Sequence, residues 1–122
     1  MLRSGVDLIE IDRIESSIAR YGDRFTRRVY TEGEIAYCAG RATSLAARFA
    51  AKEAVSKLLG VGIQHREGVD WREIEIVSAD NGDPSVRLHG KAQRRAHEMG
   101  LNEIALSFSH THDHAIAFVV AQ

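Results

Sequence analysis

The stretch from Arg48 to Lys57 constrains the fold of this chain more than any other part of the sequence. It consists mainly of alanines and straight-chain charged residues, and no glycine or proline interrupts it before Gly60, so it predicts the interior of a helix. Apolar residues recur at helical spacing on two of its faces, which indicates burial on both flanks. We expect this helix to run from about Thr43 to Leu59, because glycine is common just past a helix end.

The charged residues of this helix form two pairs at i, i+4 spacing. Glu53 precedes Lys57, which is the favourable order for an ion pair on a helix. Arg48 and Lys52 carry like charge, and no acidic side chain on the same stripe offsets their repulsion. Two cations held side by side on a buried helix indicate an anionic partner, most simply a phosphate. The alternative is a solvated face with salt bridges.

Asp7 interrupts a run of β-branched and aliphatic residues, Val6 to Ile11, that predicts a strand. A carboxylate inside a strand costs free energy unless it is paired, hydrogen-bonded or bound to a metal. Asp7 therefore makes local hydrogen bonds or faces solvent at an edge, or else it is a ligand of a hard cation, which prefers oxygen donors.

The other segments mix helix and strand patterns. Thr31 and Glu34 have the spacing of a capping box that begins a short helix. The remaining expected elements are an amphipathic helix over 11–21, strands over 71–77 and 85–88, a helix over 91–99, and a closing hairpin of strands over 103–109 and 115–120. This mixture predicts an α+β fold with a mainly antiparallel sheet and the long helix packed against it. With 122 residues and 44% apolar content, we expect a single domain over 1–122.

Composition excludes several classes of protein. The formal net charge of −1 gives no electrostatic footprint for nucleic-acid binding. No apolar run is long enough to span a bilayer, so we expect no membrane partner. Cys38 is the single cysteine, which excludes an internal disulfide and fits a reducing compartment. We therefore expect a cytoplasmic protein.

Arginines gather in the first expected helix and the segment after it. The five within sixteen residues are Arg13, Arg20, Arg24, Arg27 and Arg28. In a chain of near-zero net charge this local excess indicates a docking surface for an acidic protein partner, with a solvated face as the alternative.

Three histidines lie close together in the closing hairpin: His110, His112 and His114. Imidazole is a common zinc ligand, and the run resembles the motif of metallo-β-lactamase-type zinc hydrolases, although it is one residue short. We expect His110, at the end of a strand, to be functional and the other two to face solvent in the turn.

Taken together, these motifs resemble the holo-(acyl carrier protein) synthases, the short-chain branch of the 4′-phosphopantetheinyl transferases. The resemblance covers the whole chain in order. It is carried by Gly5-Val6-Asp7-Leu8, by Arg48-Phe49-Ala50-Ala51-Lys52-Glu53-Ala54 with Lys57, by Gly60-Val61-Gly62-Ile63, by Asn81-Gly82-Asp83-Pro84, and by Ser109-His110-Thr111 followed by Ala115-Ile116-Ala117.

The resemblance implies an activity in fatty acid biosynthesis. Members of this family transfer the 4′-phosphopantetheine group of coenzyme A to a serine of apo acyl carrier protein and release adenosine 3′,5′-bisphosphate. The resemblance also implies the 4′-phosphopantetheinyl transferase fold and a homotrimer with each active site at a subunit interface. A non-catalytic module that kept the fold is an alternative, but it predicts a broken Asp7, Glu53 or Lys57, and all three are present.

The same resemblance assigns roles to residues. Asp7 and Glu53 would hold Mg²⁺, and Glu53 and Lys57 would be the catalytic residues. The coenzyme A site would be formed by Arg48, Lys52, Lys57, Gly60, Gly62 and His110, with Asn81 and Gly82 near the adenine. Acyl carrier protein would dock on Arg13, Arg20 and Arg24. The general base remains open between Glu53, Glu34 and a metal-bound water.

Overall fold

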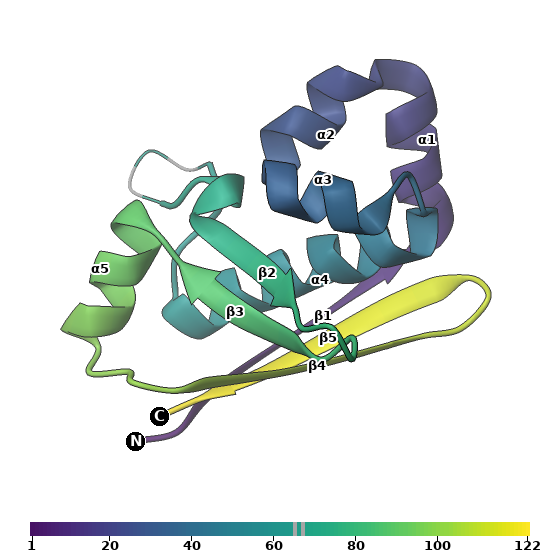
Figure 1. Ribbon diagram of the computed structural model, residues 1–122. Coiled ribbons are helices and arrows are strands. Elements are labelled where there is room, and N and C mark those ends of the chain that lie inside the picture. The colour runs from purple at the N-terminus through teal and green to yellow at the C-terminus, as the bar shows by residue number, and fades with distance from the viewer. Residues whose placement is uncertain (65, 67) are drawn as a thin grey trace.

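The structure, a computed structural model of the chain, describes residues 1–64, 66 and 68–122 (Figure 1). In chain order its elements are β1 (Arg3–Glu10), α1 (Ile11–Tyr21), α2 (Asp23–Val29), α3 (Glu32–Cys38), α4 (Ala42–Leu59), the short 3₁₀ helix η1 (Trp71–Glu73), β2 (Ile74–Ser78), β3 (Pro84–Leu88), α5 (Gly90–Glu98), β4 (Ile104–His110) and β5 (His114–Ala121). No helix in this described part of the chain is long and apolar enough to cross a membrane.

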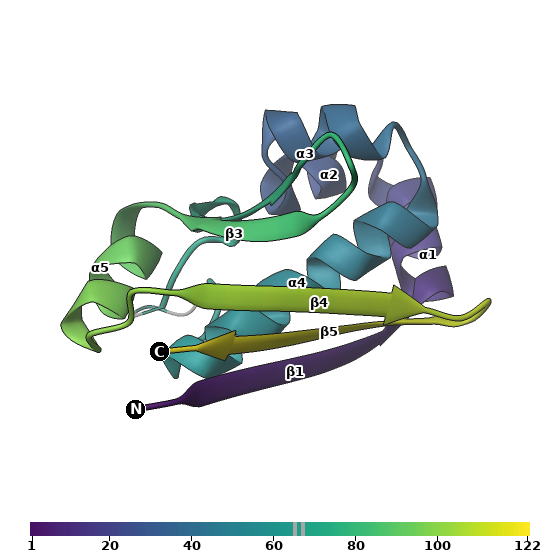
Figure 2. The ribbon, with the colours of Figure 1, turned by 60° about the horizontal axis from the view of Figure 1, so that its bottom comes forward.

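The strands form two separate antiparallel sheets. One has the order β1-β5-β4, so that β1 and β4 are its two edges, and the other is the β2–β3 hairpin. Helix α4 lies across one face of the three-stranded sheet, while α1, α2 and α3 gather over one end of it and α5 lies at the other end (Figures 1 and 2). The predicted α+β fold, with its long helix packed on an antiparallel sheet, is confirmed.

Helix α4 is buried on almost every side, as its apolar pattern predicts. The alanines that make it slender and let neighbouring backbones approach are Ala46, Ala47, Ala50, Ala51 and Ala54. The closest approach is at Gly5 of β1, where an added Cβ atom would stand 2.0 Å from the carbonyl oxygen of Ala54. This position therefore requires glycine, and it brings Asp7, two residues further along β1, to the same flank of α4.

The C-terminal end of α4 is held by two arginines from distant parts of the chain. Nε of Arg3 donates to the carbonyl oxygen of Leu58 at 2.8 Å, and Nε of Arg95 donates to that of Leu59 at 2.9 Å. Gly60 follows in the left-handed conformation, with φ of 68°. These contacts satisfy terminal carbonyl groups and place positive charge where the helix dipole favours it.

Two parts of the chain differ from the prediction. The segment expected as a strand from Trp71 begins with the 3₁₀ helix η1, and β2 starts only at Ile74. The cause is a capping box between Asp70 and Glu73, in which each side chain accepts a backbone N–H near the other. Helix α2 was not predicted at all, because Gly22 ends α1 and hides the short helix that follows it.

Candidate active site

Asp7, Glu53 and Lys57 meet at the edge formed by β1 and α4, and we call them the carboxylate cluster. Nζ of Lys57 donates to Oδ1 of Asp7 and to the carbonyl oxygen of Val6, each at 3.0 Å. Glu53 lies one turn before Lys57 on α4 and is half-buried. Burial raises the pKa of Glu53, and the nearby charge of Asp7 raises it further, while Lys57 and Arg13 act in the opposite direction. Two carboxylates thus share one partly desolvated place.

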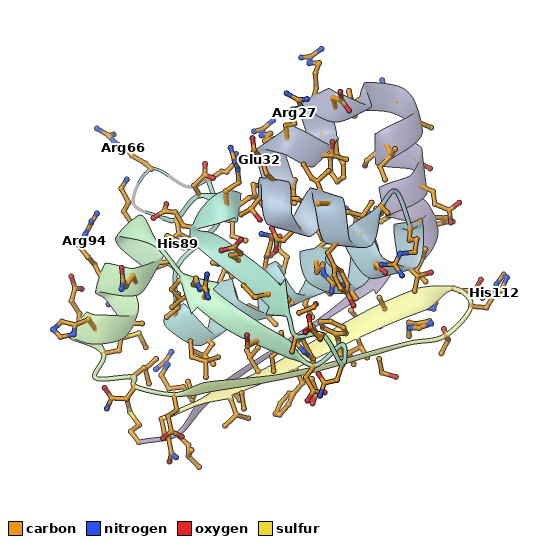
Figure 3. All side chains as sticks on the ribbon, in the orientation of Figure 1. Arg27, Glu32, Arg66, His89, Arg94 and His112 are labelled. Atoms are coloured by element: carbon orange, nitrogen blue, oxygen red, sulfur yellow. The ribbon has the colours of Figure 1, made fainter. Side chains whose placement is uncertain are left out.

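The donors of this cluster suit a hard cation better than zinc. Among the described residues, no three or more histidine, cysteine, aspartate or glutamate side chains gather as a metal site. Two carboxylates leave the other positions to water and substrate oxygens, which is how Mg²⁺ is commonly bound. His110, His112 and His114 are all exposed, and His112 points away from the molecule at the tip of the hairpin (Figure 3). The zinc-hydrolase alternative therefore has no ligand set in this part of the chain.

Arg48 lies in a second group of residues, the Arg48 cluster, with Tyr37, Ser78 and Phe108. Its side chain is buried, and its guanidinium carbon is 4.6 Å from the ring centre of Tyr37 and 5.3 Å from that of Phe108. Nη2 donates to Oγ of Ser78 at 2.6 Å and Nη1 to the carbonyl oxygen of Ser44 at 3.1 Å. Nε has no hydrogen-bond partner within the described residues. A buried guanidinium with an unsatisfied donor fits the predicted role of an anion ligand.

The two clusters lie on different flanks of α4. Arg48 and Glu53 are five residues apart, which separates them by about 140° around the helix axis. Lys57 contacts β1, whereas Arg48 contacts β4 at the opposite edge of the sheet. Asp7 and Phe108 share one row of the sheet with Ala117 between them, so their backbones are about 10 Å apart. One chain does not bring Arg48 beside its own carboxylate cluster.

The predicted role of Lys52 as a phosphate ligand is wrong. Its side chain is completely buried, and Nζ donates to Oε1 of Glu34 at 2.8 Å, to the carbonyl oxygen of Trp71 at 3.1 Å and to that of Ile74 at 2.5 Å. An ammonium group has three donors, so none remains for a ligand. Burial lowers the pKa of Lys52, and the charge of Glu34 opposes this shift. Glu34 comes from another helix, which the pattern within α4 could not reveal.

Glu34 is equally unsuited to be the general base. It is 1% exposed, and Oε1 accepts from the backbone N–H of Thr31 as well as from Lys52. Oε2 accepts from the backbone N–H of Ile76 at 2.8 Å. Thr31 and Glu34 form the predicted capping box, so Glu34 has a structural role in α3 and in the core.

The remaining nucleotide-site candidates lie in turns and at a strand end. Gly60 ends α4, and Gly62 follows in the loop after it. Asn81 and Gly82 lie in the exposed turn of the β2–β3 hairpin. A groove of about 530 Å³ lies between that turn and β4, lined by Gly82, Asp83, Pro84, Ser85 and the residues from Ile104 to Phe108. His110 shares its strand face with Phe108, so it belongs to the side of the molecule that carries the Arg48 cluster.

The predicted docking arginines form an exposed patch on α1 and α2. All five side chains are exposed, and Arg27 projects outward from α2 (Figure 3). The guanidinium of Arg20 lies 5.4 Å from the ring centre of Tyr21, and Tyr21 is 48% exposed. Arg13 lies close enough to Glu53 to lower its pKa, so this arginine borders the carboxylate cluster.

Sequence reasoning missed three residues of the Arg48 cluster, Tyr37, Ser78 and Phe108. Their own neighbourhoods in the sequence carry no signal, because the contacts join α3, β2 and β4 to α4 across long separations in the chain. The alternation of apolar and polar residues in β4 places Phe108 on the inner face of the sheet, and this was the one available hint.

Comparison with known proteins adds a family to this geometry. Residues 3–119 match the model of the 4'-phosphopantetheinyl transferase superfamily. A holo-[acyl-carrier-protein] synthase of Herpetosiphon aurantiacus is 55% identical, with 98% of each chain covered, and one of Solibacter usitatus is 48% identical, with 98% of this chain and 96% of the other covered.

Solved structures agree with these relatives. The crystal structure of Helicobacter pylori holo-[acyl-carrier-protein] synthase in complex with coenzyme A matches with a TM-score of 0.87 and 32% identity, over 98% of this chain and 99% of that one. The structure of the Neisseria meningitidis synthase matches with a TM-score of 0.85 and 34% identity, over 98% and 97% of the two chains. The chain therefore belongs to the holo-(acyl carrier protein) synthase family of the 4′-phosphopantetheinyl transferase superfamily.

Proposed function

We propose that this protein transfers the 4′-phosphopantetheine group of coenzyme A to a serine of apo acyl carrier protein, releasing adenosine 3′,5′-bisphosphate, and so serves fatty acid biosynthesis. The observation that carries the proposal is the meeting of Asp7, Glu53 and Lys57 at one edge of the fold. Family membership supplies the reaction, and this cluster supplies groups that can perform it.

Asp7 and Glu53 are the residues that would hold Mg²⁺, which supplies charge neutralisation at the pyrophosphate of coenzyme A when it is bound. Lys57 is more than half exposed and uses two of its three donors on Val6 and Asp7. Its third donor has no hydrogen-bond partner among the residues that the structure describes, so it can bind a phosphate oxygen and stabilise the charge that grows on the leaving group.

The serine hydroxyl must lose its proton to a group within hydrogen-bond reach. The buried hydrogen bonds of Glu34 remove it from the candidates. Glu53 remains, acting directly or through a water molecule. Glu53 is half-buried, and this partial burial strengthens the electrostatic interactions of the site.

We further propose a homotrimer with each active site at a subunit interface. The Arg48 cluster and the carboxylate cluster lie on different flanks of α4, so the Arg48 cluster of one chain would complete the site of its neighbour. An assembly surface is also available, because four large apolar side chains are exposed on the sheet face opposite α4: Val6, Leu8, Ile116 and Phe118. Exposed apolar groups of this kind commonly mark protein interfaces.

Within that assembly, Arg48 and His110 would bind phosphate groups of coenzyme A, with Gly60 and Gly62 near the phosphates. Asn81 and Gly82 would lie near the adenine, at the groove between the hairpin turn and β4. The acidic carrier protein would dock on Arg13, Arg20 and Arg24, which are exposed, and Arg13 lies near Glu53 of the carboxylate cluster.

Intact-mass spectrometry of apo acyl carrier protein, incubated with this protein, coenzyme A and Mg²⁺, tests the reaction. We expect a mass gain of one phosphopantetheine group that EDTA abolishes. If coenzyme A binds but no carrier protein gains mass, the protein is the non-catalytic module that kept the fold.

A further inference from the structure

The buried ion pair of Lys52 and Glu34 joins four elements of the fold. Lys52 belongs to α4, and it donates to the carbonyl oxygens of Trp71 in η1 and Ile74 in β2. Glu34 belongs to α3, and it accepts from the backbone N–H of Ile76, also in β2. Every donor of Lys52 and both oxygens of Glu34 are used, so the pair is a fully satisfied polar contact inside an apolar core.

The β2–β3 hairpin is positioned by the packing of Ile74 and Ile76 in the core and by polar contacts of this kind. Within the described residues it forms no ladder with the three-stranded sheet, so strand pairing does not fix where the hairpin lies relative to that sheet. The surface of α4 is rich in alanines, and small side chains of this kind offer few projections that would fix the register of a neighbour. Polar contacts from α4 have directions and partners. Those that reach β2 directly are the bond from Lys52 to the carbonyl oxygen of Ile74 and the bond from Arg48 to Ser78. Lys52 also holds Glu34, which accepts from the backbone N–H of Ile76.

The hairpin that is held in this way carries part of the proposed nucleotide site. Its turn contains Asn81 and Gly82, and Gly82 lines the groove that continues to Phe108 beside Arg48. Lys52 directly precedes Glu53 on α4. The same helical turn therefore carries one residue that contacts the hairpin and one that belongs to the carboxylate cluster.

We propose that Lys52 and Glu34 are positioning residues, which set the β2–β3 hairpin against α4 and thereby shape the coenzyme A side of the active site. The proposal rests on the proposed function for its substrate. Replacing a buried ion pair by neutral groups often leaves a protein as stable as before, whereas one role of such pairs is to select a single register. A purely structural pair would be replaceable without a change in substrate binding.

The test is the double substitution Glu34→Gln with Lys52→Met, which removes both charges and keeps the volumes similar. Wild-type activity is measured first, so that failure of the proposed function is recognised separately. For a folded double variant we expect the KM for coenzyme A and its Kd by calorimetry to rise about tenfold or more, with the KM for carrier protein unchanged. Hydrogen exchange of residues 74–88 should become faster, because the hairpin has lost its fixed partner.

Arg87→Gln is the matched control, since Arg87 lies on the paired strand β3 of the same hairpin and is exposed, and it should leave all these values unchanged. A folded double variant that binds coenzyme A within about twofold of wild type would overturn the proposal. If the double variant does not fold, Glu34→Asp replaces it, because the shorter carboxylate cannot reach both Lys52 and Ile76. An unchanged KM and Kd for coenzyme A in that variant would overturn the proposal equally.

Discussion

Gly5 and Ala54 are in such close contact that β1 and α4 leave no space for a side chain between them: a Cβ atom on Gly5 would stand 2.0 Å from the Ala54 carbonyl oxygen. This contact brings the strand that carries Asp7 and the helix that carries Glu53 together. The glycine of the Gly-Val-Asp run is therefore a packing requirement that serves the site.

Gly5→Ala should separate the strand from the helix. We expect a loss of about 1–3 kcal/mol in the free energy of unfolding, because overpacking strains the backbone, and a large loss of activity, because Asp7 moves away from Glu53. Denaturant unfolding and the mass-spectrometric assay measure the two effects. Ser4→Ala is the control, since Ser4 lies next in the chain but is exposed. Wild-type stability in Gly5→Ala would show that the two backbones can separate freely.

Glu53→Gln should abolish turnover while the fold is kept. The amide can neither accept the serine proton nor bind a hard cation well, so we expect a loss of about a hundredfold or more in kcat and a weaker dependence on Mg²⁺. Glu103→Gln changes an exposed glutamate and should be neutral. Near-normal activity of Glu53→Gln would remove this residue from both proposed roles.

The same substitution should change how stability depends on pH. Burial and the charge of Asp7 raise the pKa of Glu53 above its ordinary value of 4.5 in the folded chain. The folded chain therefore binds this proton more tightly than the unfolded chain, and the stability that it contributes is present below pH 4.5 and is lost as the pH rises through the folded pKa.

The glutamine of Glu53→Gln does not titrate, so the variant should not lose this stability. Its free energy of unfolding should therefore rise relative to that of wild type as the pH rises. Denaturant unfolding at about pH 4 and about pH 7, with EDTA present, measures the difference between the two proteins. The free energy of unfolding of Glu53→Gln minus that of wild type should be larger at about pH 7 than at about pH 4, and a smaller value at pH 7 would contradict a raised pKa.

Arg48→Ala should chiefly weaken the binding of coenzyme A. The guanidinium offers charge-assisted hydrogen bonds to a phosphate, so we expect its removal to raise the KM for coenzyme A about tenfold or more. Arg94→Ala is the control, because Arg94 projects from α5 away from the rest of the molecule (Figure 3). A folded Arg48→Ala variant with unchanged KM would assign Arg48 to packing between Tyr37 and Phe108 alone.

Reversing the charge of Arg20 and Arg24 should affect only the protein substrate. We expect Arg20→Glu with Arg24→Glu to weaken the binding of the carrier protein by about tenfold or more. The effect should be larger at low salt, and the binding of coenzyme A should be unchanged. Arg13 is left in place because it lies near Glu53. Surface plasmon resonance with immobilised carrier protein measures the effect, and loss of both substrates would instead indicate misfolding.

Features that depend on neighbouring residues could be predicted from the sequence, and those that depend on distant ones could not. The long helix, the capping box of Thr31 and Glu34, and the closing hairpin follow from local patterns. The role of Lys52 was misjudged because its partner, Glu34, is eighteen residues away in another helix. The pattern on α4 revealed two neighbouring cations without an acidic partner on the same stripe of the helix, but not that one of them is satisfied inside the core by a residue of another helix.

The apolar outer face of the three-stranded sheet has a consequence for how this enzyme should be assayed. If subunits associate through Val6, Leu8, Ile116 and Phe118, dilution uncovers these side chains and dismantles every site that two chains share. Activity per milligram should then fall as the protein is diluted, and the rate should rise faster than in proportion to enzyme concentration. The dilute protein should also adsorb to surfaces, because each free subunit exposes the apolar outer face of its sheet.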